Sequence, residues 1–281
     1  MSGYPERFRT VSCAWPSGRA VMFVRAVIDL HCHLLAGIDD GPADLDGSLA
    51  LARAAVAAGT RTIVATPHVS SRYPNDAPTI HRLVELTAAE LAREGVPLDV
   101  LPGAEIAITR LAEIEPEQLD RLSLGGGPWL LLEPPFTSVA AGLDITILGL
   151  LAGGRRICLA HPERCPAFHR EPRMLETLVD NGVLTSLTAG SLVGRFGGSV
   201  RRFALELMEA EMVHNVASDA HDERDRPPGI GPELEESGFA GLRDWLAWEV
   251  PAAIVAGEAL PPRPPVKRAR TRKSVWPWKR G

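Results

Sequence analysis

The sequence predicts an α/β protein in which parallel strands alternate with helices and close into a barrel. Seven apolar or β-branched runs recur about 30 residues apart, with helical or mixed segments between them. At 281 residues and 45% hydrophobic content, the chain can bury one large core, as single α/β barrels do. Several runs also end in metal-binding residue types, and the strand ends of such a barrel form the rim where active sites are built.

The predicted elements follow from local composition. Strands are expected at residues 24–30, 60–65, 98–102, 129–133, 156–160, 183–187 and 213–217. Helices are expected at residues 46–58, 79–94, 138–153, 171–181 and 198–210. In the first helix, the Ala- and Leu-rich run SLALARAAVAA has high helix propensity. Asp46 or Ser48 can cap its start, and Gly59 suits its C-terminal cap.

Two histidines one residue apart end the first predicted strand. Side chains at positions i and i+2 of a strand point to the same face, so His31 and His33 converge while Cys32 faces the other way. An HxH pair alone is also compatible with two polar side chains at a solvated strand end. Its interpretation as a pair of metal ligands depends on what the other strands carry.

Later runs end in the same kinds of side chain. The runs are RTIVATPH, LDVLPGAE, WLLLE, RICLAH and VHNVASDAH, ending in His68, Glu105, Glu133, His161, and Asp219 with His221. An ionised carboxylate beside a buried strand is costly unless a cation or hydrogen bonds compensate it. One such ending would indicate a solvated strand exit. The series predicts a shared polynuclear metal site.

Cysteine usage and hydropathy bear on the cellular compartment. The four cysteines, at positions 13, 32, 158 and 165, form no close CxxC pair, which argues against a disulfide framework or a zinc ribbon. No run approaches the roughly 18 apolar residues of a membrane span, and the N-terminus lacks a continuous apolar signal core. We therefore expect a soluble, cytoplasmic protein.

Charge divides the chain into three parts. The net charge is −5, but residues 263–280 hold eight Lys or Arg and no acid, so residues 1–262 carry −13. We expect an irregular leader at 1–23, one domain at 24–260 and a basic, Pro-rich, disordered tail at 261–281. The tail is either solvated without a partner or, through Trp276 and Trp278, suited to an anionic membrane surface or an acidic partner. Nucleic acid is disfavoured because the basic charge is confined to the tail.

The order of the motifs resembles a known family. HxH, DDGP, TPH, GAE, E, HPER and SDAH occur in the order of the PHP superfamily of polymerase and histidinol phosphatase domains. DDGP, HPER and SDAH followed by RPP are most similar to the bacterial PHP-type protein-tyrosine phosphatases encoded with capsule and exopolysaccharide genes, over residues 26–235. The resemblance implies a distorted seven-stranded (β/α) barrel of PHP type that holds three divalent metal ions. Manganese is expected, with iron or zinc as alternatives.

The resemblance also implies a role for each site residue. His31, His33, Glu105 and Asp219 would hold the first metal, Glu105 as a bridge with Glu133 and His161 the second, and Asp40, His68 and His221 the third. Arg164 and Arg226 match positions expected to bind phosphoryl oxygens, which a planar guanidinium does well. The residues alone barely separate Asp39 from Asp40 as a ligand, and the family register favours Asp40.

The implied activity is metal-dependent hydrolysis of protein phosphotyrosine by a metal-activated water. The expected substrate is the autophosphorylated, Tyr-rich tail of a bacterial tyrosine kinase that controls capsular or exopolysaccharide synthesis. Two alternatives stay open: a PHP phosphatase of a small phosphomonoester such as histidinol phosphate, and a non-enzymatic metal-binding regulator. Some relatives form homo-oligomers, so self-association is also open, as is location at the inner face of the membrane.

A cysteine mechanism is the main competing chemistry. Cys158 and Arg164 have the Cys-x5-Arg spacing of cysteine-dependent tyrosine phosphatases. The intervening LAHPE lacks the small, Gly-rich residues whose backbone amides cradle a phosphate, and Cys158 lies within an apolar strand. This mechanism is therefore disfavoured.

Other polar residues have weaker interpretations. His81, His169 and His214 are expected to be helix, loop and strand residues and not ligands. Asp29 shares a strand face with His31, so it is either a hydrogen-bond partner behind the ligands or an interior polar contact. Thr188 stands where relatives commonly carry Asn, which leaves a contact at that position in doubt.

Overall fold

The computed structural model describes residues 25–137 and 141–265, which contain nine strands. The strands are β1 (Val27–Cys32), β2 (Thr60–Ala65), β3 (His68–Val69), β4 (Asp99–Pro102), β5 (Glu105–Ala107), β6 (Trp129–Glu133), β7 (Arg156–Ala160), β8 (Leu184–Thr188) and β9 (Asn215–Ala217). The α-helices are α1 (Leu45–Ala57), α2 (Ala77–Arg93), α3 (Pro116–Arg121), α4 (Leu143–Ala152), α5 (Pro166–Arg170), α6 (Pro172–Asp180), α7 (Ala189–Leu192), α8 (Gly198–Glu209), α9 (Gly231–Glu236) and α10 (Val250–Ala256). Short 3-10 segments η2 (Ile108–Glu113), η3 (Leu124–Gly126), η4 (Pro162–Arg164) and η5 (Ala240–Leu242) and a π-helical segment η6 (Trp245–Glu249) complete the described elements.

The strands form two sheets in which every neighbouring pair is parallel. One sheet has the order β1-β2-β4 and the other the order β3-β5-β6-β7-β8-β9. The predicted parallel α/β class is confirmed. The described residues do not form a single closed sheet. The ladder divides where β2 passes into β3 through Thr66 and Pro67, and Pro67 has no N–H to donate to a neighbouring strand.

The free edge of β1 is hydrogen-bonded to the segment that follows β9. Asp219 N donates to His31 O at 2.8 Å, and His33 N donates to Ala220 O at 2.9 Å. Cys32 and Ala220 form an isolated parallel bridge at the same place. The first and last strands of the described fold therefore meet, and their carboxyl ends lie together.

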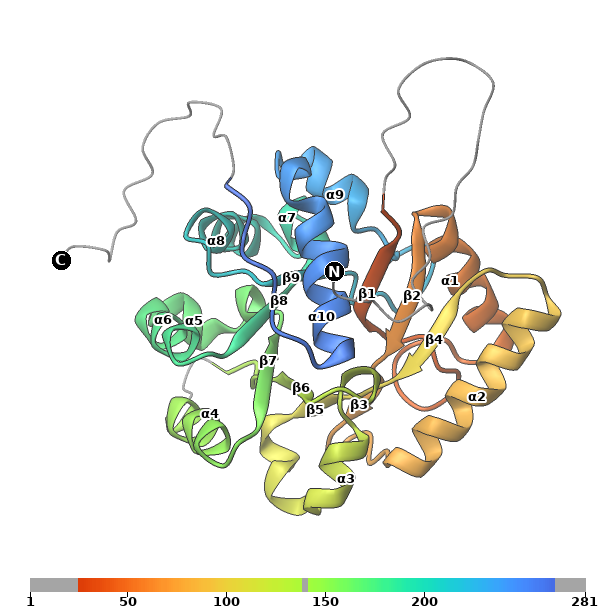
Figure 1. Cartoon of the computed structure of the whole chain (residues 1–281), viewed down its shortest axis with the longest axis horizontal. Coiled ribbons are helices and arrows are strands. Elements are labelled where there is room, and N and C mark those ends of the chain that lie inside the picture. The colour runs from red at the N-terminus through yellow and green to blue at the C-terminus, as the bar shows by residue number, and fades with distance from the viewer. Residues whose placement is uncertain (1–24, 138–140, 266–281) are drawn as a thin grey trace.

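Helices surround the strands. Figure 1 shows α1, α2, α4, α6 and α8 around the outside, while α10 lies near the middle of this view, beside β1. Helix α1 begins where the Asp44 side chain accepts from Gly47 N, two residues before the predicted cap Asp46 and four before Ser48. It ends as predicted, because Gly59 takes a φ of +98°, which favours glycine. The buried face of α1, which includes Leu51 and Ala55, packs on the strands.

Long apolar runs were predicted accurately and short elements were missed. The strands predicted at 60–65, 129–133 and 156–160 have the observed bounds, and the other four are shifted by up to three residues. Strands β3 and β5 were not predicted because two or three residues carry no periodicity. Of the helix predicted at 138–153, the structure describes α4, and residues 138–140 lie outside the described residues.

The first residues of the predicted tail contact the domain. Trp245 Nε1 donates to Pro261 O at 3.1 Å, and the Arg263 guanidinium donates to Val213 O at 2.9 Å and to Met208 O at 3.3 Å. Pro261 and Arg263 therefore contact η6, the end of α8 and the segment that precedes β9. The predicted leader at 1–23 and the rest of the tail lie outside the described residues.

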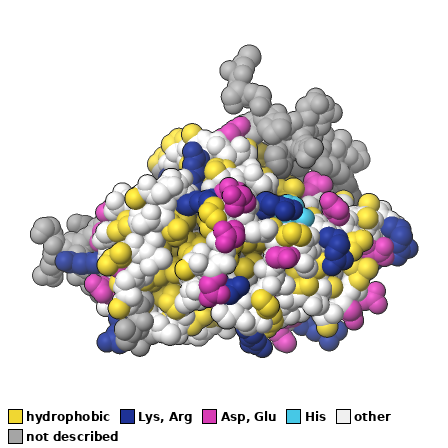
Figure 2. Space-filling view, turned by 90° about the horizontal axis from the view of Figure 1, so that it is seen from below, with side chains coloured by type: hydrophobic (Ala, Val, Ile, Leu, Met, Phe, Trp, Pro, Cys, Tyr) yellow, Lys and Arg dark blue, Asp and Glu magenta, His cyan; other side chains and the backbone are white. Residues whose placement is uncertain are grey.

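Surface charge is mixed on the face drawn in Figure 2. Lys and Arg side chains are interspersed there with Asp and Glu, with hydrophobic side chains between them. A nucleic-acid surface is expected to carry a large basic patch. The described residues on this face form no such patch. Among the described residues, no helix is both long enough and apolar enough to pass through a bilayer.

His214 predicts how stability depends on pH. Thr185 N donates to His214 Nδ1 at 3.1 Å, so this nitrogen must keep its lone pair. Burial, together with the positive charge of Arg263, lowers the pKa of His214 to about 4. The unfolded chain, with a pKa near 6.5, binds this proton first as the pH falls. Stability contributed by neutral His214 is therefore lost between about pH 6.5 and pH 4.

A His214→Asn variant tests this, because the Asn side-chain oxygen can accept from Thr185 N but does not titrate. Between pH 7 and pH 4.5 we expect the free energy of unfolding of the variant to fall less than that of the wild type, by roughly 1–3 kcal/mol. Urea denaturation at each pH measures the difference. Parallel curves for the two proteins would contradict the prediction.

Candidate metal centre

The structure brings all nine predicted metal ligands to one end of the strands. They come from the carboxyl end of a strand or from the loop that follows it: His31 and His33 with Asp40 after β1, His68 in β3, Glu105 in β5, Glu133 in β6, His161 after β7, and Asp219 with His221 after β9. Seven of them form three overlapping groups of possible ligand atoms, and His161 and Asp219 contact members of these groups. The predicted convergence at the strand ends is therefore what the structure shows.

The first group is enclosed by the β1 histidines and two carboxylates. His31 Nε2 lies 3.2 Å from His33 Nε2, 3.3 Å from Glu105 Oε2 and 3.4 Å from Asp219 Oδ1. His33 Nε2 is 3.4 Å and 3.5 Å from the same two oxygens. Ligands that each lie about 2.0–2.1 Å from one tetrahedral ion are separated by about 3.3–3.4 Å, so the spacing fits a shared cation.

The second group surrounds Glu105, Glu133 and His161. His161 Nε2 is 2.7 Å from Glu105 Oε1 and 4.0 Å from Glu133 Oε1. Burial and the negative charge of Glu105 raise the pKa of Glu133 to about 7. Burial would also raise the pKa of Glu105, but His31 and His161 outweigh it and hold that pKa well below its ordinary value. Two neighbouring carboxylates, one buried and one partly buried, that share a histidine suit a cation between them.

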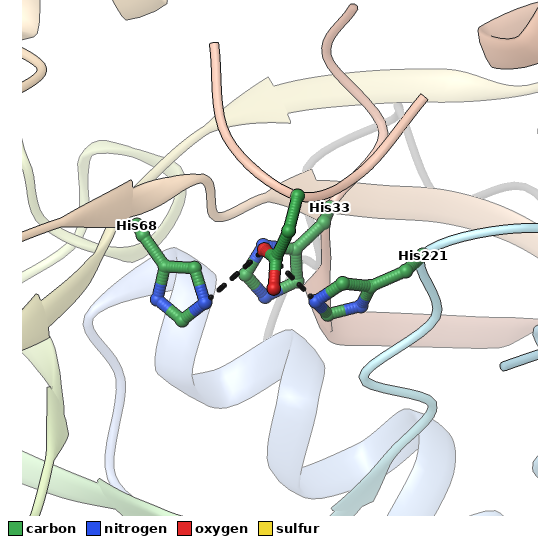
Figure 3. A group of neighbouring side chains, drawn as sticks. His33, His68 and His221 are labelled. Atoms are coloured by element: carbon green, nitrogen blue, oxygen red, sulfur yellow. Dashed lines mark ion pairs between the residues drawn. The ribbon is translucent and has the colours of Figure 1, made fainter. Parts of the chain in front are cut away.

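The third group is shown in Figure 3, where His68 and His221 point at one carboxylate beside His33. That carboxylate belongs to Asp40, whose Oδ1 is 3.4 Å from His68 Nε2 and 3.3 Å from His221 Nε2. The neighbouring imidazoles of His221 and His68 lower the pKa of Asp40. Asp40 is thus ionised at neutral pH.

His221 provides a test of whether a cation fits. Its Nδ1 lies 3.1 Å from the backbone oxygen of Asp219, which can only accept, so Nδ1 carries the proton. Burial and the positive charge of His33 lower the pKa of His221, so the ring is neutral. Its buried Nε2, which has no hydrogen-bond donor among the described residues, therefore presents a lone pair to the ionised Asp40. Two electron-rich atoms face each other, and a cation between them would remove the repulsion.

Asp39 holds the site from behind, which sequence reasoning missed. Its Oδ2 is 2.7 Å from His33 Nδ1 and accepts from His68 N at 3.0 Å, while its Oδ1 accepts from Gly41 N at 2.9 Å. With Nδ1 donating to Asp39, His33 turns Nε2 toward the first group. A Cβ at Gly41 would lie 2.4 Å from His33 O, so the DDGP loop needs glycine there.

Asp29 joins the first and last strands and does not contact an imidazole nitrogen in the structure. Its carboxylate accepts from Ser218 Oγ at 2.5 Å, from Ser218 N at 3.0 Å and from His31 N at 3.2 Å. Asp29 therefore positions the backbone that carries His31 and Asp219. Of the two sequence interpretations, this is the interior polar contact, placed directly beneath the site.

Two predicted ligands have unusual backbone conformations. His161 has a φ of +31° and Asp219 a φ of +52°, in the left-handed region that non-glycine residues rarely adopt. Such conformations persist where the surroundings hold them in place, and they cluster at functional sites. Both residues lie just past a strand, where the strain turns the side chain toward the cluster.

The two predicted arginines converge on one oxygen. Arg164 NH1 is 2.5 Å and Arg226 NH2 is 2.6 Å from Asp219 Oδ2. Burial alone would raise the pKa of Asp219, but His31 and other positive groups, Arg226 among them, hold it well below its ordinary value. The guanidinium groups therefore lie at the metal cluster, within reach of an anion bound beside it.

Glu163 was also missed, although it lies within HPER. Its buried Oε1 accepts from Thr188 N at 3.0 Å and from Ser191 Oγ at 2.7 Å. This carboxylate fastens the loop after β7 to the end of β8. Thr188 itself is buried and contributes its backbone amide to this contact.

The remaining histidines lie outside the described metal groups. His81 Nε2 is 2.9 Å from Arg121 O, His169 Nε2 is 2.6 Å from Glu163 O, and His214 pairs with Thr185. Each has a structural partner, as expected.

The cysteine alternative has no support in the geometry. Cys158 is fully buried in β7, and burial raises the pKa of its thiol to about 12. The thiol is therefore not ionised at neutral pH, whereas the nucleophile of such enzymes is a thiolate.

A comparison with family models matches residues 27–235 to the family described as capsular polysaccharide synthesis, CpsB/CapC. The chain belongs to the CpsB/CapC family. Within it, the chain is 39% identical over 201 residues to the tyrosine-protein phosphatase YwqE of Bacillus subtilis, covering 71% of this chain and 79% of YwqE. It is 32% identical over 206 residues to the putative tyrosine-protein phosphatase CapC of Staphylococcus aureus, covering 72% and 79%. The resemblance predicted from the motifs is confirmed.

Solved structures of the CpsB/CapC family agree with the fold. The chain matches one from a study of YwqE from Bacillus subtilis and CpsB from Streptococcus pneumoniae, described as unique metal-dependent tyrosine phosphatases. The TM-score is 0.71 at 34% identity, over 86% of this chain and all of that one. A β-aspartyl dipeptidase from Fervidobacterium islandicum, 14% identical with a TM-score of 0.54, over 82% of this chain and 72% of the dipeptidase, shares the fold alone.

The contacts of Asp39 generate a prediction about metal affinity. In Asp39→Asn one oxygen must replace two, so the amide cannot accept from both His33 Nδ1 and Gly41 N. We expect Mn²⁺ to bind about ten- to a hundredfold more weakly. Titration calorimetry measures the affinity. Asp46→Asn, on the exposed start of α1, is the matched control and should bind as the wild type does. Equal affinity in the two variants would refute this role of Asp39.

Proposed function

We propose that this chain hydrolyses phosphotyrosine in proteins with divalent metal ions. The single observation that carries the proposal is the convergence of nine imidazole and carboxylate side chains at the strand ends. The named activity of YwqE and of the CpsB proteins, and the metal dependence stated for them, support the same reaction.

The ligand sets are those that the family resemblance implies. His31, His33, Glu105 and Asp219 would hold one ion, Glu105, Glu133 and His161 a second, and Asp40, His68 and His221 a third. The distances around His31 and the lone pair of His221 support at least the first and third of these. The set contains nitrogen and oxygen but no thiolate, so manganese, iron and zinc all suit it, and we expect manganese.

Bound cations would neutralise the phosphate dianion and lower the pKa of a water molecule. The protein's own contribution is positional. Arg164 and Arg226 would bind the phosphoryl oxygens from the side of Asp219, where both guanidinium groups already lie. Asp39 would keep the His33 imidazole, and Asp29 the backbone of His31, in place to bind the first metal.

The proposed substrate is the autophosphorylated tail of a bacterial tyrosine kinase that regulates capsular or exopolysaccharide synthesis. The capsular description of the family supports this partner. Action in the cytoplasm, near the inner face of the membrane, would follow from such a partner. Contact of the basic tail with anionic lipid, and self-association, belong to the same proposal.

We also propose that the nine described strands amount to a barrel of seven. We infer that β2 with β3 and β4 with β5 each act as one bent strand, because only two residues separate the members of each pair. Together with the hydrogen bonds between β1 and the segment after β9, this arrangement supports a distorted seven-stranded barrel. The domain would then extend over residues 24–260.

A phosphotyrosyl peptide tests the function. Manganese-loaded protein should release phosphate, and chelation should abolish the release. His161→Ala should lose at least about a hundredfold in kcat/KM, because it removes a ligand and not merely a supporting contact. Cys158→Ser, three residues earlier in β7, should stay active.

Three results would contradict the proposal. Manganese-loaded protein that hydrolyses histidinol phosphate but no phosphotyrosine would identify a small-molecule phosphatase. Protein that binds metal but hydrolyses no phosphate ester would identify a regulator. Full activity in His161→Ala, or an inactive but folded Cys158→Ser, would overturn the metal assignment.

A further inference from the structure

Two aromatic side chains stack on the rings of proposed ligand histidines. The Phe136 ring lies 5.4 Å from the His161 ring, with 23° between the planes. The Tyr73 ring lies 5.6 Å from the His68 ring, with 9° between the planes. Each ring thus rests against the metal cluster, and each could also meet a substrate there.

The exposure of the two rings differs. Tyr73 is partly buried, with the Arg72 guanidinium 5.0 Å from its ring centre. Phe136 is 49% exposed, which places it among the few large hydrophobic side chains that the described residues expose. An isolated exposed Phe needs no explanation. This one is stacked on a ligand imidazole and still presents apolar surface to the solvent.

Phe136 also borders the proposed phosphate site. The Arg164 guanidinium carbon is 5.3 Å from the Phe136 ring and 4.4 Å from the Phe196 ring, while its NH1 reaches Asp219. Arg164 therefore lies beside two aromatic rings at the edge of the metal cluster. A phosphate bound at Arg164 would lie close to these rings. An aryl group esterified to that phosphate would then lie close to them too.

We propose that Phe136 selects aromatic phosphate esters by stacking its exposed ring surface on the aryl group of the substrate. This inference rests on the proposed function and names the side chain that would distinguish phosphotyrosine from an alkyl phosphate. Aromatic pairs with centroids 4.5–7 Å apart contribute beyond the area that they bury, by about two- to tenfold in binding. The phosphate contacts alone carry no such preference.

Phosphonate binding tests the inference without catalysis. Phenylphosphonate and methylphosphonate share the anionic group and differ in the ring, so the ratio of their dissociation constants reports aryl recognition. Titration calorimetry of the manganese-loaded protein gives this ratio. We expect the wild type to prefer phenylphosphonate, Phe136→Leu to reduce that preference about two- to tenfold, and Phe136→Tyr to retain it. Thermal denaturation checks that the variants are folded.

Tyr73→Leu is the matched control, because it removes an aromatic ring stacked on the other ligand histidine. It should alter the affinity for both phosphonates alike and leave their ratio unchanged. The inference is wrong if Phe136→Leu keeps the wild-type ratio, or if Tyr73→Leu reduces the ratio as much. Turnover of a phosphotyrosyl peptide by the wild type is measured separately. A reduced ratio in Phe136→Leu without that turnover would support the aryl contact while contradicting the proposed function.

Discussion

Four imidazole rings surround the carboxylate of Glu105, and the site is organised around it. Its Oε2 lies 3.3 Å from His31, 3.4 Å from His33 and 3.0 Å from His68, and its Oε1 lies 2.7 Å from His161. Oε2 is buried and accepts no hydrogen bond from the described residues. So many ionisable groups can be buried together only if their charges are compensated, and divalent cations compensate carboxylates and imidazole lone pairs at once.

The fold supplies the convergence that this compensation needs. Parallel strands end on one side, so residues distant in sequence meet without long loops. Asp29 and Ser218 join the first and last strands under the site, and Asp39 fixes one imidazole from behind. The left-handed conformations of His161 and Asp219 store strain that the surrounding contacts must offset.

Sequence reasoning identified the residues whose chemistry repeats and missed those whose role depends on direction. Apolar runs predicted most strands, and the side chains ending these runs predicted eight of the nine proposed ligands, whereas Asp40 came from the family resemblance. Asp39 and Glu163 could not be assigned, because sequence does not show which way a loop carboxylate points. Strands β3 and β5 are too short for periodicity, and the preference of α1 for Asp44 as its cap depends on the exact first turn. The ladder divides near Pro67. The sequence shows this proline, but only the structure shows which strands it separates.

Anomalous diffraction at the manganese edge, from crystals of the manganese-loaded protein, tests the central claim most directly. The account predicts a peak bonded to Glu105 together with His31 and His33, a second peak on the His161 side of the same carboxylate, and a third between Asp40 and His221. A map in which no anomalous peak lies within bonding distance of Glu105 would contradict it.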